Sequence, residues 1–272
     1  MSSAPIGIFD SGLGGLSVWR QVVHHLPSES LVYLADQAHV PYGQRSSQEI
    51  RAFCIEIARQ LLASDCKAIV VACNTASAVA LDCLRQAFPD LPILGLEPAV
   101  KPAVELTRSG VVGVMATPAT FQGELYRATV GRWARDVQVV EQVCIGLADL
   151  VERGELEGDG CDALLRSFLA PMLAAGADTI VLGCTHYPFV IESIRRLVGP
   201  TLAVLDPAPA VARHLGDVLS RHGLLCSQDG SSRHQFFTSG CPEAFDRAAA
   251  RLVGASSNSQ HLVWQNAHLL RS

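Results

Sequence analysis

The 272-residue sequence has few charged residues and no cluster of basic ones. Asp, Glu, Lys and Arg make up 17% of the chain, and the formal net charge is −5. Binding to a nucleic-acid backbone depends on grouped Lys and Arg side chains, so we expect no nucleic acid as primary partner. Hydrophobic residues reach 49%, which is enough for a packed core and unlike a disordered chain.

Long apolar runs are also absent. The longest, such as residues 68–73, are far shorter than the ~20 residues that a membrane-spanning helix needs. The first residues, Met1–Pro5, contain no basic stretch followed by an apolar one, as a secretion signal would. We therefore expect a cytoplasmic protein without a membrane partner, and association into a homodimer is left open.

Cofactor motifs are missing as well. No GxGxxG precedes a helix in the dinucleotide-binding arrangement, and the glycines of Gly12–Gly15 lack the Lys-Ser/Thr pair of a phosphate-binding loop. No lysine stands in a recognisable pyridoxal context. We expect no cofactor, with the chemistry carried by side chains alone.

The nine cysteines form no CxxC pair, and both their odd number and their irregular spacing argue against a disulfide framework or a zinc site. No metal site is therefore expected. Most of these cysteines are interpreted as small buried hydrophobic residues. Seven are assigned to the core on this basis: Cys54, Cys66, Cys83, Cys144, Cys161, Cys226 and Cys241.

Short apolar runs alternate with longer amphipathic segments, which is typical of an α/β fold with parallel sheets covered by helices. The expected strands are Ile6–Phe9, Leu31–Leu34, Ala68–Ala72, Ile93–Gly95, Val111–Met115, Val137–Glu141, Thr179–Leu182, Leu202–Leu205 and Gln235–Phe237. The expected helices include Ser46–Leu62, Ala76–Ala87, Thr120–Ala134, Ala163–Ala175 and Ala208–Leu219.

A weak internal repeat indicates two similar α/β halves. The segment 68–75, with Cys73, aligns with 179–186, with Cys184, and the segment beginning at Ile6 resembles the one beginning at Val112. The second half begins near Pro98. The tail after about Asp206 either extends the second half or returns to the first, and the periodicity does not choose between them.

Polar residues follow several of the expected strands, at the edge where ligands bind in open α/β sheets. These residues are Asp10, Ser11, Asp36, Tyr42, Gly43, Cys73, Asn74, Thr75, Thr117, Thr120, Cys184, Thr185 and His186.

Both Cys73 and Cys184 are predicted to lie where a strand meets a helix N-terminus, which lowers a thiol pKa from about 8.5 toward neutrality. Two such thiols in matching positions of two related halves suggest one sulfur on each side of a small molecule. Racemisation needs that geometry, because one group removes a proton while another delivers one to the opposite face. Asp10 and His186 are suitably placed to tune the two thiols.

Other interpretations remain open. Taken alone, Asp10-Ser11-Gly12 is as compatible with a turn and helix cap as with a binding site, and Tyr42-Gly43 with an ordinary turn. Glu152 alone is compatible with a solvated helix end. A covalent nucleophile at Cys73 leaves Cys184 unexplained, and a non-enzymatic amino-acid-binding module explains neither thiol. The nearest rival hypothesis is an enzyme that uses the same pair of thiols on a different substrate, such as an aspartate racemase or a related decarboxylase or isomerase.

Taken together, the motifs resemble the glutamate racemases over nearly the whole chain. The resemblance rests on Gly7–Leu16 (GIFDSGLGGL), Ala35-Asp36 with Pro41–Gly43, Val71–Ala76 (VACNTA) and Gly183–Pro188 (GCTHYP). It implies two three-layer α/β domains, 1–97 plus about 207–272 and 98–206, with the active site at their interface. It also implies cofactor-free interconversion of L- and D-glutamate, which supplies D-glutamate for peptidoglycan.

The resemblance further implies residue roles. Cys73 matches the thiol that acts on D-glutamate and Cys184 the one that acts on L-glutamate, with Asp10, His186 and Glu152 assisting. The positions that match substrate contacts are Asp10, Ser11, Tyr42, Gly43, Asn74, Thr75, Thr117, Thr120, Thr185 and His186.

The sequence departs from the family in the loop 116–120, where Pro118 removes a backbone N–H from a turn that is usually glycine-rich. The contact of this loop with a carboxylate is therefore the least secure implication. No extension precedes the Asp10 segment of the kind that accompanies activation by a cell-wall precursor, so we expect activity without such an activator.

Overall fold

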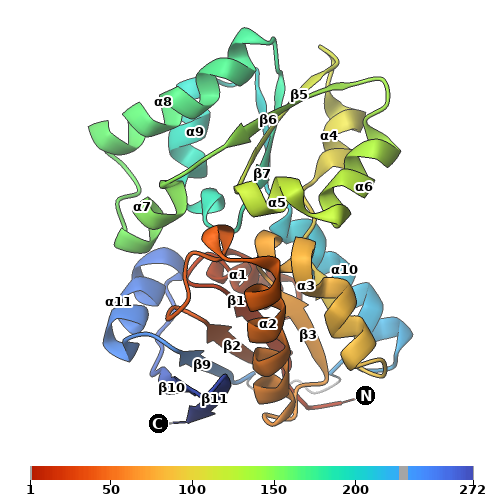
Figure 1. Cartoon of the computed structure of the whole chain (residues 1–272), viewed down its shortest axis with the longest axis vertical. Helices are drawn as coiled ribbons and strands as arrows, with labels where there is room; N and C mark the ends of the chain where they lie inside the picture. The colour runs from red at the N-terminus through yellow and green to blue at the C-terminus, as the bar shows by residue number, and fades with distance from the viewer. Residues whose placement is uncertain (1, 227–231, 272) are drawn as a thin grey trace.

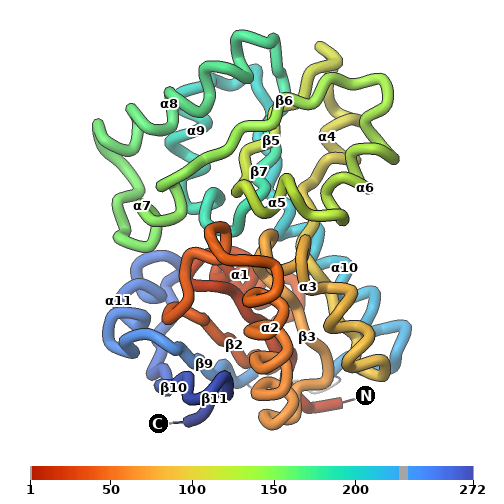
Figure 2. The backbone as a smooth tube through the Cα atoms, viewed as in Figure 1, coloured from red at the N-terminus to blue at the C-terminus, as the bar shows by residue number. Residues whose placement is uncertain are grey.

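The computed structural model describes residues 2–226 and 232–271 and contains two separate sheets, each covered by helices on both faces (Figure 1). The two α/β units lie one above the other along the long axis of the molecule, as the backbone trace also shows (Figure 2). The expected α/β fold with mainly parallel sheets is confirmed. Among the described residues, no helix is long and apolar enough to cross a membrane.

The first sheet has seven strands and takes in both ends of the described chain. Their order is β11 (His268–Arg271), β10 (Gln260–Gln265), β9 (His234–Thr238), β2 (Leu31–Ala35), β1 (Ile6–Asp10), β3 (Ala68–Val71) and β4 (Ile93–Gly95). The pairing is parallel except between β10 and β11, which form an antiparallel hairpin. The strands after residue 206 from β9 onward thus join the sheet of β1.

Two apolar cores cover this sheet. One face packs against α1 (Leu16–His25), α10 (Ala208–Arg221) and α11 (Pro242–Val253). The other packs against α2 (Ser47–Leu62) and α3 (Asn74–Ala87). Every residue of β1, β2 and β3 is buried, as expected for continuous apolar runs in a sheet covered on both sides.

The second sheet is smaller and entirely parallel, with the order β6 (Gln138–Val143), β5 (Val111–Ala116), β7 (Thr179–Gly183), β8 (Ala203–Leu205). One face packs against α7 (Leu147–Arg153), α8 (Asp159–Ala174) and α9 (Ile191–Val198), and the other against α4 (Val100–Leu106) and α6 (Glu124–Trp133). The order β6-β5-β7-β8 reproduces β2-β1-β3-β4 of the first sheet, as the internal repeat predicts.

One expected helix is wrong in detail. Instead of a single helix Thr120–Ala134, the chain forms α5 (Pro118–Gln122) and α6, separated at Gly123. The backbone of Gly123 is extended there, and a Cβ at this position would lie 2.5 Å from the Cβ of Ala78 on α3. Because only glycine permits this approach, the helix breaks where the second unit contacts the first.

A buried ion pair lies at the amino ends of β2 and β3 in the first sheet. Lys67 Nζ lies 2.6 Å from Glu29 Oε2, and both side chains are only 3% exposed. Lys67 also donates to the carbonyl of Ser2, and Glu29 accepts the backbone N–H of Cys226. The pair therefore connects the N-terminal segment with the segment that follows α10.

We expect Lys67→Met to lower the free energy of unfolding by roughly 3–5 kcal/mol, because it leaves the Glu29 carboxylate buried without its cation. Lys101→Met is the matched control, since its two exposed contacts, the 3.9 Å ion pair with Glu105 and the cation–π contact with Trp133, each contribute at most about 1 kcal/mol. Urea denaturation of both variants measures the difference. Equal stabilities for the two variants would contradict the expectation.

Candidate active site

Cys73 lies two residues beyond the end of β3 and is the N-cap of α3. Its buried sulfur accepts the backbone N–H of Ala76 at 3.4 Å and lies 3.9 Å from Ser11 Oγ, to which the thiol donates. Because β3 ends just before this residue and α3 begins just after it, the thiol lies at the carboxyl end of the strands of the first sheet.

Cys184 follows β7, the strand that matches β3 in the second sheet, and is likewise buried. Its sulfur lies 3.6 Å from Nδ1 of His186. The expected helix N-terminus is absent here, because a 3₁₀ turn (Tyr187–Val190) separates Cys184 from α9. The imidazole of His186 is the polar partner of this sulfur in place of a helix N-terminus.

The expected lowering of the Cys73 pKa is wrong. Burial raises the pKa of Cys73 well above its usual value, and the negative charges of Asp10 and Cys184 raise it further. The N–H of Ala76 acts in the other direction but does not compensate. Cys73 is therefore a protonated thiol in the free protein, because removing this sulfur from water costs more than the helix terminus returns.

His186 forms a buried pair with Glu152 of α7. Nε2 of His186 lies 2.7 Å from Glu152 Oε1. Burial alone lowers the pKa of His186, but its hydrogen bonds to Cys184 and Glu152 raise it well above its usual value. Burial raises the pKa of Glu152, yet the hydrogen bonds from His186, Leu13 and Gln37 lower it overall. Both directions describe an imidazolium paired with a carboxylate.

The loop after β1 packs against the segment that carries Cys184. Asp10 is fully buried and accepts the N–H of Gly12 at 3.0 Å and the hydroxyl of Thr185 at 3.3 Å. Burial raises the pKa of Asp10, and the charge of His186 partly opposes this effect. A Cβ on Gly14 would lie 2.5 Å from both His186 Nδ1 and Thr185 Oγ1, so glycine permits the close approach of the two units here.

Tyr42 and Gly43 lie in a 3₁₀ turn (Tyr42–Gln44) after β2. The hydroxyl of Tyr42 donates to Asp36 Oδ2 at 2.7 Å, and burial together with Asp36 raises its pKa, so it remains a neutral donor. A Cβ on Gly43 would lie 3.2 Å from the Cβ of Thr117, the N-cap of α5, which places this turn against the second unit.

Three threonines form a second contact between the units. Thr75 Oγ1 lies 2.9 Å from Thr117 Oγ1, which lies 2.9 Å from Thr120 Oγ1. Thr117 is also the N-cap of α5 and accepts the N–H of Thr120. Pro118 occupies the first position of α5, where no N–H is needed within the helix, so the proline fits this loop.

Asn74 is the one predicted site residue whose side chain is buried without partners. It is 3% exposed, and neither Oδ1 nor Nδ2 has a hydrogen-bond partner. A buried amide without partners costs free energy that a polar ligand would recover. Asn74 is adjacent to Cys73, so this unmet capacity lies beside the thiol.

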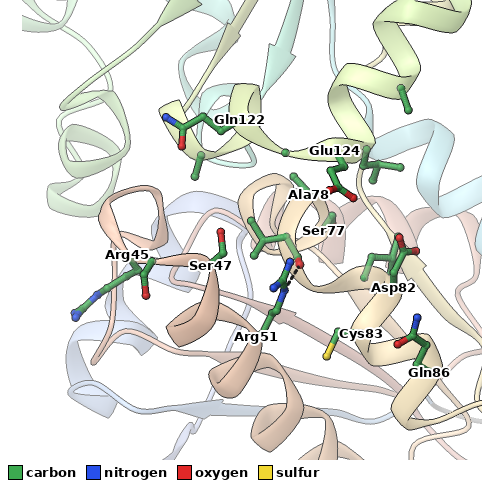
Figure 3. Close-up of a pocket in the computed structure, with 17 residues that line it drawn as sticks. Arg45, Ser47, Arg51, Ser77, Ala78, Asp82, Cys83, Gln86, Gln122 and Glu124 are labelled. Carbon is green, nitrogen blue, oxygen red and sulfur yellow. Dashed lines mark hydrogen bonds between the residues drawn. The ribbon is translucent and has the colours of Figure 1, made fainter.

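A groove of about 790 Å³ lies beside this site, between α2 and α3 of the first unit and α5 and α6 of the second (Figure 3). Its labelled polar side chains include Arg45, Arg51, Asp82 and Glu124, so charges of both signs line it. None of the predicted site residues lines it. The groove is thus separate from the contacts that join the two thiol-bearing loops.

The sequence-predicted residues therefore meet between the carboxyl ends of the two sheets. The structure adds two residues to the predicted site, because the backbone N–H of Leu13 and the side chain of Gln37 both donate to Glu152. Sequence spacing gives no signal for these contacts, because Leu13 and Glu152 are separated by 139 residues.

The family profile of the Asp/Glu/hydantoin racemases matches residues 6–215, which covers both thiols and the loops around them. The chain belongs to the Asp/Glu/hydantoin racemase family. It is therefore related to isomerases that invert a carbon centre. Within this family, the curated relatives that it resembles are glutamate racemases.

A glutamate racemase of Roseiflexus sp. (strain RS-1) is 49% identical over 92% of this chain and 93% of its own length. A glutamate racemase isoform from Bacillus anthracis superposes with a TM-score of 0.89 at 31% identity, over 98% of this chain and all of its own. The Francisella tularensis glutamate racemase, solved in complex with D-glutamate, has a TM-score of 0.83 at 29% identity, over 94% of this chain and 96% of its own. The chain is an amino-acid racemase of this group.

Proposed function

We propose that the chain interconverts L- and D-glutamate by a two-thiol mechanism without a cofactor, and so supplies D-glutamate for peptidoglycan synthesis. The observation that carries the mechanism is the placement of Cys73 and Cys184 after matching strands, β3 and β7, of two sheets with the same strand order. The substrate follows from the glutamate racemases that the chain resembles over nearly all of its length.

In this proposal, the hydrogen bonds support a different role for each sulfur. The imidazolium of His186 can donate to Glu152 through Nε2 and to the sulfur of Cys184 through Nδ1, so Cys184 is the acceptor in this pair. Cys73 is a thiol that donates to Ser11. The free protein is thereby prepared to take a proton at Cys184 and give one at Cys73, the direction from L- to D-glutamate.

In that direction, the thiolate of Cys184 removes the α-proton and becomes a thiol. The electron pair left on the α-carbon takes the proton of the Cys73 thiol from the opposite face, and Cys73 becomes a thiolate. The α-ammonium group of the substrate, a cation close to Asp10 and both sulfurs, favours a thiolate on either side. D-glutamate reacts by the reverse steps.

The remaining polar groups bind the substrate in this proposal. From the first unit, the unpaired amide of Asn74 binds the substrate together with Ser11, Tyr42, Gly43 and Thr75. Thr117, Thr120, Thr185 and His186 contact the substrate from the second unit. Since these groups belong to both sheets, substrate binding also holds the two units together.

We further propose the domain division 1–97 with about 207–272, and 98–206. Supporting it, β9 pairs with β2 of the first sheet, whereas β8 pairs with β7 of the second. A cytoplasmic location is also proposed. All nine cysteines are free, which suits a reducing compartment. The homodimer left open by the sequence is tested by light scattering after gel filtration.

The function is tested by proton NMR and optical rotation of purified protein with L-glutamate in heavy water, without pyridoxal phosphate or metal. Loss of the α-proton signal with decay of rotation to zero is expected. No exchange with glutamate but exchange with aspartate would change the substrate to that of an aspartate racemase. No exchange with either would contradict the proposed racemisation.

We expect Asn74→Ala to raise KM for glutamate by roughly 10- to 100-fold, because a hydrogen bond to a charged group contributes about 1.5–3 kcal/mol. The melting temperature is expected to stay unchanged or rise, since the variant removes two unpaired buried polar atoms. Steady-state kinetics and thermal melts measure both quantities, with the exposed Asn258→Ala as control. An unchanged KM would exclude Asn74 from substrate binding.

A further inference from the structure

Gln37, which follows β2, connects the first unit to the acid–base residues of the second. Its Oε1 accepts the hydroxyl of Thr238 at 2.8 Å, and its Nε2 donates to Glu152 Oε2 at 3.3 Å. The oxygen of that hydroxyl accepts the N–H of Gly240, so its proton is free to point at Gln37. The amide therefore has a defined orientation, with its NH₂ group directed at Glu152.

The carboxylate of Glu152 belongs to the second unit but is held largely by the first. Oε1 accepts the N–H of Leu13 at 2.7 Å as well as Nε2 of His186, while Oε2 accepts Gln37. Figure 1 shows α7, which carries Glu152, at the boundary with the first unit, on its α11 side. Leu13 and Gln37 can make these contacts only when the two units are together.

We infer that Gln37 is a positioning residue for the proposed racemisation: it orients Glu152, and through it His186 and Cys184, when the two units close. This inference rests on the proposed function. The Thr238–Gln37–Glu152–His186–Cys184 series of contacts links the end of β9 in the first sheet to the thiol that follows β7. The Cys184 half of the site is then complete only in the closed arrangement.

The groups around Glu152 determine how an added charge at position 37 would act on the Glu152–His186 pair. His186 is the cation that Glu152 contacts directly, and Asp10 and Tyr33 are the other titratable groups on which its charge acts. The guanidinium of Arg251 on α11 packs against Gly154, and Arg153 pairs with Glu155 in solvent. Gln37 is the uncharged neighbour, so a carboxylate there adds one negative charge beside the pair.

The test compares Gln37→Glu with Gln138→Glu, which adds the same charge at an exposed position on β6. A carboxylate at position 37 still accepts from Thr238 but no longer donates to Glu152. The added negative charge raises the pKa of both His186 and Glu152, since a charge within 4–6 Å shifts a pKa by roughly 1–3 units. The pH profile of kcat/KM is therefore expected to move to higher pH by about one unit.

A second variant, Gln37→Leu, removes the donor without adding charge. It is expected to lower kcat by roughly tenfold with little change in KM, because Gln37 orients an acid–base group rather than substrate. Melting curves establish that each variant is folded. The equilibrium constant of racemisation is one, so kcat/KM must fall equally from either enantiomer.

A Gln37→Glu profile that coincides with that of Gln138→Glu, or that moves to lower pH, would overturn the inference. So would a Gln37→Leu variant with wild-type kcat, or one in which only KM changes. The failure of the proposed function is a distinct result, because the wild-type protein would then show no racemisation of glutamate at all.

Discussion

Replacing either Cys73 or Cys184 by serine is expected to lower racemase activity at least 1000-fold in both directions, since a positioned acid or base contributes roughly 10²–10⁴-fold and each turnover uses both groups. A hydroxyl is far less acidic than a thiol, so neither serine can alternate between donor and acceptor near neutral pH. The fold is expected to persist, because the exchange alters one atom. Polarimetry from L- and from D-glutamate measures the loss.

Cys83→Ser is the matched control for this pair. Cys83 lies on α3, ten positions beyond Cys73, but it is partly exposed and has no part in the site. Its serine variant should retain wild-type activity. Substantial turnover by either Cys73→Ser or Cys184→Ser would contradict the mechanism, and an inactive Cys73→Ser beside an active Cys184→Ser would instead favour a single nucleophile.

Glu152→Gln is expected to lower kcat/KM by roughly 100-fold at neutral pH. The pKa of His186 is raised by Glu152 against a burial effect that lowers it. Cys184 also raises this pKa and remains in the variant, but without the carboxylate the contribution of Glu152 is lost, so the pKa of His186 falls and the imidazolium is lost at lower pH. The alkaline limb of the pH profile should therefore move to lower pH, opposite to the shift expected for Gln37→Glu.

The control for Glu152→Gln is Glu155→Gln, two positions beyond α7, where the carboxylate pairs with Arg153 in solvent. It should leave the profile unchanged. A profile of Glu152→Gln that keeps its alkaline limb in place, or moves it to higher pH, would show that Glu152 does not sustain the charge of His186.

Much of the fold could be predicted from the sequence because the central strands are buried on both faces. The runs in β1, β2, β3 and β7 are short, continuous and largely apolar, which is typical of strands in a parallel sheet that helices cover on both faces. The hairpin of β10 and β11 could not be predicted in this way. It lies at the sheet edge, its residues are of mixed polarity, and its turn places Asn266 and Ala267 at positive φ without a glycine.

The thiols could also be located from sequence, since each follows a strand of the internal repeat. Their electrostatic surroundings could not. The pKa of Cys73 depends on the depth of burial and on Asp10, which lies 63 residues away in the chain. Glu152 meets Leu13 only because α7 packs against the first unit, and it meets His186 because α7 also packs against the 3₁₀ turn that follows Cys184. No local sequence pattern predicts either contact.

The central claim is that two opposed thiols share the proton transfer, and the position of the deuterium label in early turnover tests it most directly. L-glutamate is converted in heavy water to a few per cent, the enantiomers are separated, and the α-position of each is analysed by mass spectrometry. Two groups predict deuterium in the D-glutamate formed and the original proton in the L-glutamate recovered. A single group acting on both faces would label both enantiomers alike or carry the original proton into the product, and either result would contradict the account.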